Sequence, residues 1–240
     1  MQWSSVPGLA SLLDLLCPPR CAFCSAEEAA GRPPVCGGCA RVLSAGLARC
    51  TGCGEQHHTG RCRRGYRGDG MVVLSDYGDE VRAAVLRAKR PSGEAVAAGL
   101  GTLLAAKHRD VLSEWMLDAV VPVPMHWLRR MVRGTSAADE IATGVARTLG
   151  VPRRRLLRRL RRTPRQNEVP AEERSANVRG AFRGRGRVAG RRILLVDDVC
   201  TTGATLAECR RILVEAGAAA VYAAVIARAD GRLPDDSDHP

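Results

Sequence analysis

The chain has few aromatic residues and no long apolar run, and each shortage limits the class of protein to which it can belong. Aromatics make up 3% of the 240 residues, so a buried core must be built mainly from Ala, Val, Leu and Ile. No apolar run reaches the roughly 18 residues that a bilayer-spanning helix needs. The N-terminal stretch VPGLASLLDLLCPP contains Asp14 and lacks a basic segment and a small-residue cleavage site. We therefore expect no export and no membrane insertion, and a cytoplasmic location.

Lysine is also scarce, because only Lys89 and Lys107 occur, and arginine carries most of the positive charge. Sixteen arginines lie between residues 147 and 192 against three glutamates, so this region carries most of the net charge of +12. A concentrated positive field suits an anionic partner, either a polyphosphate or a nucleic acid. The alternative is a proteome that uses arginine in place of lysine throughout.

Ten cysteines are present, and eight of them fall within residues 17–62. In a chain without an export signal, such clustering favours thiolate metal ligands over disulfides. Two C-x-x-C pairs, separated by eleven residues, have the spacing of a tetrahedral four-cysteine zinc site. We predict a structural zinc ion held by Cys21, Cys24, Cys36 and Cys39. The alternative is a flexible segment of reduced, metal-free cysteines.

A second cysteine group is one ligand short. Cys50, Cys53 and Cys62 supply three thiolates, and His57 or His58 could complete a second zinc site. A degenerate remnant that binds no metal is the other interpretation.

Hydrophobic periodicity predicts an α/β domain after the cysteine-rich part. Predicted strands at 71–77, 117–124, 191–198 and 220–228 alternate with predicted helices at 79–90, 92–112, 135–149 and 203–217. This alternation predicts a mainly parallel sheet flanked by helices on both faces. The polar stretch after Arg162 predicts a long loop. We expect a cysteine-rich zinc-binding module at 1–68, a larger domain at 69–228 and a disordered tail at 229–240.

The stretch LLVDDVCTTGATL, residues 194–206, predicts a ligand site. Ligands of parallel sheets bind beyond the carboxyl ends of the strands, where Asp197 and Asp198 would emerge. The following turn would present backbone N–H groups and a positive helix end to a phosphate, and Gly203 would allow close approach. A ribose 5-phosphate with an associated Mg²⁺ fits both features. A receiver domain and a purely structural helix cap are the competing interpretations.

This stretch resembles the phosphoribosyltransferase signature, in which an apolar strand leads into two acids and a T-T-G-x-T turn. The resemblance implies binding of 5-phosphoribosyl 1-pyrophosphate (PRPP) with Mg²⁺, with Asp197 and Asp198 as the catalytic acids at the ribose hydroxyls. It also implies that the 5-phosphate is held by Thr201, Thr202, Gly203, Ala204 and Thr205.

The order of motifs along residues 9–228 resembles the competence-associated ComF family, also called GntX. The motifs are LLDLLCPPRCAFC, a Y-G-x-x-V-R…K segment from Tyr77 to Lys89, VPVP followed by RG, RRTPRQ with ERSANVRGAF, and DDVCTTG. The family implies a type I phosphoribosyltransferase fold behind an N-terminal zinc module. It suggests a pyrophosphate loop with Arg129, Arg133 and Gly134, and a mobile loop with Arg162, Gln166, Arg174 and Asn177.

Two features limit what the resemblance assigns. Lys89 matches a family lysine without an assigned role. Residues 133–137 read RGTSA where the family usually has RGFNQ, so an aromatic and two amide side chains are absent.

Two functions follow from these features. The first is an enzyme that transfers a phosphoribosyl group, with Mg²⁺, to an acceptor that the sequence does not reveal, in connection with DNA uptake. The second is a non-catalytic module of DNA uptake or processing that binds single-stranded DNA through the arginines of residues 153–165, with PRPP as a regulatory ligand. Stacking aromatics are nearly absent from that segment, where only Phe182 lies close by.

Overall fold

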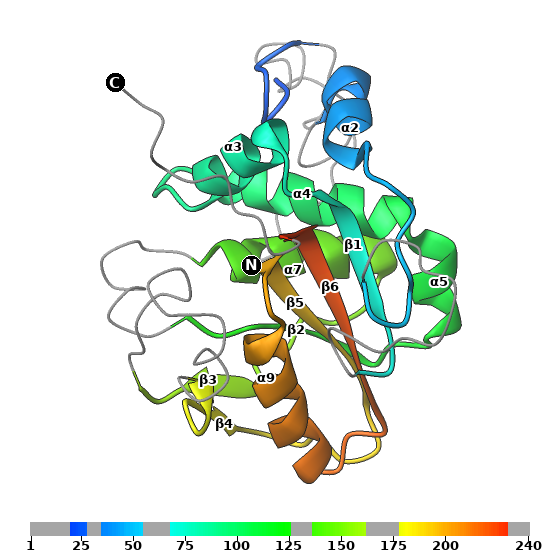
Figure 1. Ribbon diagram of the computed structural model, residues 1–240, viewed down its shortest axis with the longest axis vertical. Coiled ribbons are helices and arrows are strands. Elements are labelled where there is room, and N and C mark those ends of the chain that lie inside the picture. Colours follow the sequence, from blue (N-terminus) through cyan, green and yellow to red (C-terminus); the bar gives the residue numbers. More distant parts are fainter. Residues whose placement is uncertain (1–19, 28–34, 55–67, 126–135, 162–177, 230–240) are drawn as a thin grey trace, which may run out of the picture.

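The centre of the molecule is a four-stranded parallel sheet (Figure 1). The computed structural model describes residues 20–27, 35–54, 68–125, 136–161 and 178–229. Strands follow one another across the sheet in the order β1, β6, β5, β2, and every neighbouring pair is parallel. They are β1 (Met71–Asp76), β2 (Ala119–Pro122), β5 (Arg192–Cys200) and β6 (Ala220–Arg228). The predicted mainly parallel α/β sheet is confirmed.

Helices cover both faces of this sheet, because alternate residues of a strand point to opposite faces. On one face Leu194 and Val196 of β5 are buried under α3, α4 and α7. On the other face Ile193 and Leu195 are buried with residues of α9, which Figure 1 shows across the sheet from α4 and α7. The helices are α3 (Asp79–Ala88), α4 (Glu94–Lys107), α7 (Ala137–Leu149) and α9 (Ala204–Glu215).

Two glycines allow α4 and α7 to pack backbone against backbone. A Cβ atom added at Gly101 would lie 2.1 Å from the carbonyl oxygen of Ile141. One added at Gly144 would lie 2.1 Å from the carbonyl oxygen of Ala98. Only residues without a side chain permit this approach, which keeps α7 close behind β2 and β5.

The single helix predicted for residues 92–112 is wrong, because the structure divides it at His108. Helix α4 ends at Lys107, and a short helix, α5 (Arg109–Glu114), begins immediately afterwards. His108 has φ −112° and ψ 25°, outside helical values. The apolar residues keep their helical spacing on both sides of His108, so the sequence pattern does not reveal the interruption.

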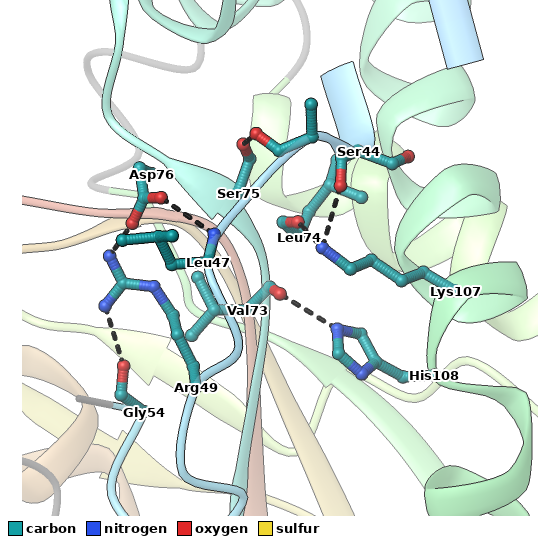
Figure 2. A network of polar contacts seen from close by, with 11 residues as sticks. Ser44, Leu47, Arg49, Gly54, Val73, Leu74, Ser75, Asp76, Lys107 and His108 are labelled. Carbon is teal, nitrogen blue, oxygen red and sulfur yellow. Dashed lines mark hydrogen bonds and ion pairs between the residues drawn. The ribbon is translucent and has the colours of Figure 1, made fainter. Parts of the chain in front are cut away.

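The end of α4 is anchored on the edge strand β1 (Figure 2). The ammonium of Lys107 donates to the carbonyl oxygens of Leu74 at 2.6 Å and Ser44 at 2.9 Å. Nε2 of His108 lies 2.8 Å from the carbonyl oxygen of Val73. Side chains at the end of α4 therefore form hydrogen bonds with carbonyl groups of β1. This contact explains why the helix is interrupted at His108.

The segment after α2 (Gly37–Ser44) runs beside the same strand. Arg49 forms an ion pair with Asp76 at the end of β1, and it also donates to the carbonyl oxygen of Gly54 at 2.9 Å (Figure 2). The backbone N–H of Met71 donates to the carbonyl oxygen of Thr51 at 2.6 Å. These bonds attach the cysteine-rich part to the edge of the sheet.

A small antiparallel ribbon lies on either side of the long loop predicted after Arg162. Strand β3 (Leu157–Arg159) pairs with β4 (Phe182–Gly184). Leu157 and Phe182 are buried in the same cluster as α9, so two apolar side chains fix a ribbon that is otherwise mostly arginine. The ribbon was not predicted: β3 precedes the loop expected after Arg162, and β4 begins where that stretch ends. Residues 162–177 lie outside the described residues, so the loop itself stays a prediction.

The predicted boundary at residue 68 remains a proposal. Phe23 and Leu43 precede it, yet both are buried in one cluster with Leu74 and Leu100 of the sheet domain. Residues 230–240 of the predicted tail lie outside the described ranges. In the part of the chain that the structure describes, no helix combines the length and apolarity needed to cross a membrane.

Candidate functional site

The two predicted acids lie near the carboxyl end of β5. The four residues before them are buried between the helical layers, whereas Asp197 and Asp198 are partly exposed. The strand was predicted to end at Asp198, but it continues to Cys200, which pairs with Arg228 of β6. Strand β2 pairs with β5 only as far as Val196, whereas β6 pairs with it as far as Cys200, so the acids lie just beyond the end of β2 on a segment held by β6.

A lysine from a distant part of the chain, Lys89, balances part of the negative charge of the two acids. Nζ of Lys89 lies 2.9 Å from Oδ2 of Asp198, and these side chains are 33% and 21% exposed. Burial opposes a charged Lys89, but the charge and hydrogen bond of Asp198, with Asp197 behind it, raise the lysine's pKa. Lys89 is therefore protonated, and the pair remains accessible to a ligand.

The surroundings of Asp197 disfavour its ionised form. Burial and then the neighbouring charge of Asp198 raise the pKa of Asp197 to about 8. The backbone N–H of Asp198 and the charges of Lys89 and Arg159 act in the opposite direction. A ligand that donates hydrogen bonds to this pair, or a bound cation, would relieve the repulsion.

The predicted phosphate turn leads directly from this strand into α9. Gly203 has φ 77° and ψ 2°, a left-handed conformation that favours glycine, and the helix begins at Ala204. Thr202 is exposed, and its Oγ1 lies 3.4 Å from the backbone nitrogen of Ala204. The first backbone N–H groups of α9 carry the positive end of the helix dipole, so the turn has the properties of an anion site beside the acids.

Arg159 is a site residue that the sequence analysis did not single out. It lies on β3, its guanidinium carbon is 5.2 Å from the ring centroid of Phe182, and its charge acts on Asp197. Nothing in the arginine-rich sequence distinguishes it from its neighbours. Its position directly opposite Phe182 is a weak signal of a special role, but this position is known only after β3 and β4 have been paired.

The ribbon is also joined to the helix that carries the phosphate turn. The buried carboxylate of Glu208 on α9 accepts the backbone N–H of Gly180 at 2.8 Å and pairs with Arg211 at 2.9 Å. Arg211 and the Gly180 N–H outweigh the effect of burial and lower the pKa of Glu208. The base of the predicted mobile loop is thus fixed to α9.

The remaining predicted loop residues lie outside the described residues. These are the pyrophosphate-loop residues Arg129, Arg133 and Gly134 and the mobile-loop residues Arg162, Gln166, Arg174 and Asn177. The described flanks of the first loop are the end of β2 and the start of α7 at Ala137. Since β2 and β5 are parallel neighbours, their carboxyl ends meet at the same edge of the sheet.

The four cysteines of the first predicted metal site do lie together. Their sulfur atoms are all within 4.8 Å of one another, and those of Cys24 and Cys36 are 3.6 Å apart. Zinc–sulfur bonds of about 2.3 Å place tetrahedral thiolates about 3.8 Å apart, so the cluster fits such an ion. Burial opposes ionisation of Cys21, but backbone N–H groups, first that of Cys36, lower its pKa to about 6.

The second cysteine group is described only in part. Cys53 is buried and Cys50 is half-buried, both near the start of β1. Cys62, His57 and His58 lie outside the described residues, so the second zinc site stays a prediction.

Comparison with known proteins gives consistent matches. Residues 134–240 match the phosphoribosyl transferase domain family. The chain is 28% identical to competence protein F of Haemophilus influenzae over 223 residues, which covers 88% of this chain and 97% of that protein. It is 30% identical to the DNA utilization protein YhgH of Escherichia coli K12 over 217 residues, which covers 86% of this chain and 96% of that protein.

Among solved structures, an allosteric regulatory enzyme of purine biosynthesis is 27% identical, with a TM-score of 0.38. The match covers 54% of this chain and a quarter, 25%, of that enzyme. The matched relatives, the parallel sheet, the acid-bearing strand and the cysteine cluster together show that this chain belongs to the ComF family and has a type I phosphoribosyltransferase fold.

Proposed function

We propose that the chain binds PRPP at the carboxyl end of β5 and transfers its phosphoribosyl group to an acceptor. The observation that carries this proposal is the continuity of the acid pair with the turn into α9. Asp197 and Asp198 would accept hydrogen bonds from the ribose hydroxyls, and residues 201–205 would hold the 5-phosphate with backbone N–H groups.

In this reaction the bond between ribose C1 and the pyrophosphate oxygen breaks, and its electron pair leaves with pyrophosphate. A lone pair of the acceptor forms the new bond to C1, and the acceptor then releases its proton. Positive charge develops on the ribose and is stabilised by the carboxylate of Asp198, and by that of Asp197 once a bound cation or a hydrogen-bond donor lowers its pKa. Bound together with the ligand, Mg²⁺ supplies charge neutralisation for the pyrophosphate, and carboxylate oxygens are ligands that it accepts. None of these steps requires a covalent protein nucleophile.

Isothermal titration with PRPP in the presence and absence of Mg²⁺ tests this proposal. We expect magnesium-dependent binding by the wild type and loss of binding in the double variant Asp197→Ala/Asp198→Ala. Glu215→Gln, an exposed carboxylate at the other end of α9, is the matched control and should bind like the wild type. A wild-type protein that binds no PRPP under either condition would remove the proposal.

A second function, binding of single-stranded DNA, is favoured by the arginines of the ribbon. Arg158 of β3 and Arg183 of β4 are direct cross-strand partners, and both are exposed. Like charges in this position repel and destabilise a strand pair. Within the described ranges neither has a carboxylate within 4.0 Å. A phosphate backbone would supply the missing negative charge, in keeping with the DNA utilization named for the YhgH relatives.

Fluorescence anisotropy with a labelled oligonucleotide separates this function from the first. We expect affinity to fall steeply between about 50 mM and about 200 mM salt, and to fall further in Arg158→Gln/Arg183→Gln. Arg109→Gln, an exposed arginine on α5, is the control and should have little effect. Binding that is lost in Asp197→Ala/Asp198→Ala and unaffected in the ribbon variant would contradict the assignment to the ribbon.

For the cysteine cluster we propose a structural zinc ion, because four thiolates at tetrahedral spacing are its preferred ligand set. Such thiolates persist in a reducing compartment, which supports a cytoplasmic location.

A further inference from the structure

The last turn of α3 touches both the cysteine cluster and the acid pair. Nη1 of Arg87 donates to the carbonyl oxygen of Phe23 at 2.5 Å, and its Nη2 donates to that of Ala22 at 3.1 Å. These two carbonyls belong to the middle residues of the Cys21-x-x-Cys24 turn. One guanidinium therefore holds the turn that presents two of the four sulfur atoms.

Lys89 follows two residues later, and its side chain contacts the acid pair instead of the cysteine turn. It is the capping residue of α3, and its backbone N–H bonds to the carbonyl oxygen of Leu86 at 3.2 Å. Its ammonium lies 2.9 Å from Asp198. A long, flexible side chain needs a fixed backbone to keep its charge at one carboxylate, because lysine loses much rotamer entropy when it is held.

The backbone at this point is held from two sides. A Cβ atom added at Gly93 would lie 2.3 Å from the carbonyl oxygen of Arg87, so the chain entering α4 packs directly on the end of α3. On the other side Phe23 is buried in one cluster with Ala84 and Ala88 of α3. Arg87 adds the polar connection on that side, so its removal would leave the helix end restrained mainly by α4.

We propose that Arg87 is a positioning residue that holds Lys89 at Asp198 through the Cys21-x-x-Cys24 turn, so that the state of the cysteine cluster tunes affinity for PRPP. The inference rests on the proposed function. Lys89 neutralises part of the acid pair and adds positive charge where an anionic ligand must approach. A displaced Lys89 would leave the acid pair facing that ligand with less compensating positive charge.

A double-mutant cycle tests the link. Arg87→Met keeps an unbranched apolar side chain but removes its donors, and Lys89→Met removes the charge. We expect each single variant to weaken PRPP binding by about tenfold and the double variant to bind no more weakly than Lys89→Met alone. Arg90→Met, the exposed arginine on the other side of Lys89, is the control and should bind within about twofold of the wild type. Additive losses would show that Arg87 does not act through Lys89.

The scarcity of lysine provides a readout that is independent of PRPP. Lys89 and Lys107 are the only lysines of the chain, so side-chain ¹³C labelling of lysine gives two NMR signals, which Lys89→Met assigns. We expect Arg87→Met to move the Lys89 signal and leave that of Lys107 in place. Chelation of the cluster metal should move the Lys89 signal in the wild type. An unmoved Lys89 signal in Arg87→Met would overturn the inference.

The outcomes separate the two proposals. If the wild type binds no PRPP, the proposed function fails, while the NMR signals still decide whether Arg87 positions Lys89. If Arg87→Met lowers the thermal stability substantially, Arg87→Gln keeps one amide donor and should restore part of both the signal position and the affinity. Equal behaviour of the Met and Gln variants would also count against a role for the Arg87 hydrogen bonds.

Discussion

His108 illustrates how one side chain gives the fold a pH dependence. Burial lowers its pKa below the ordinary value of 6.5, and the positive charge of Lys107 acts in the same direction, while the bond to the Val73 carbonyl opposes both. The unfolded chain therefore takes up a proton near pH 6.5 that the folded chain takes up only at lower pH. The contribution to stability is complete above that value and is lost as the pH falls towards the folded pKa.

We predict that the free energy of unfolding of the wild type relative to that of His108→Gln, both measured with urea, decreases between about pH 7.5 and about pH 5.5. Asp197, whose raised pKa changes stability in the opposite direction over this range, is present in both proteins and cancels in the difference. Glutamine stays neutral and retains an amide donor for the Val73 carbonyl. Lys107, Asp76 and Arg49, the charged groups of the same contact region, are unchanged in this variant. Parallel profiles for the two proteins would show that His108 is not the group responsible.

The site also shows which residues a sequence can reveal. Asp197 and Asp198 were predictable because strand, acids and turn are consecutive. Lys89 and Arg159, which act electrostatically on the acids, come from α3 and from β3. Their place depends on how distant elements pack, and no local spacing encodes that.

At the scale of elements, the contact between α4 and α7 depends on the absence of side chains. We predict that Gly101→Ala destabilises the protein by about 2 kcal/mol or more, because the new Cβ would overlap the carbonyl oxygen of Ile141 and force the helices apart. Gly37→Ala on α2 is the control, because a Cβ atom added there would lie 3.9 Å from the guanidinium of Arg41. Chemical denaturation measures both. Equal effects of the two substitutions would mean that the helices can separate at little cost.

Elements with a strong apolar pattern were predicted well, and elements fixed by tertiary contacts were not. Strands β1, β2, β5 and β6 lie inside or close to their predicted ranges because their residues are buried on both faces. The β3 and β4 ribbon was missed because only Leu157 and Phe182 mark its buried side among arginines. The break at His108 depends on carbonyl groups of β1, which no periodicity in residues 92–112 can report.

At the scale of the whole molecule, the cysteine cluster is part of the main core. Cys21 and Phe23 are buried together with residues of α3 and α4, and a Cβ added at Gly99 of α4 would lie 3.1 Å from the Phe23 ring. A metal ion that holds this turn in place therefore contributes to the stability of the sheet domain as well as to its own segment.

We predict that Cys24→Ser lowers the zinc content by one ion per chain and lowers the melting temperature, because Cys24 is one of the four proposed ligands and, being exposed, contributes little to packing. Elemental analysis and thermal unfolding measure the two effects. Cys209→Ser is the matched control. Cys209 lies on the buried side of α9, and burial raises the pKa of its thiol well above the usual range, so the substitution should lower stability without changing the zinc content. Cys50→Ser reports on the second predicted site, since loss of a further ion would show that this site is occupied. Unchanged zinc in Cys24→Ser, or a zinc-free wild type whose melting temperature is insensitive to chelators, would mean that packing around Phe23 alone holds the cluster together.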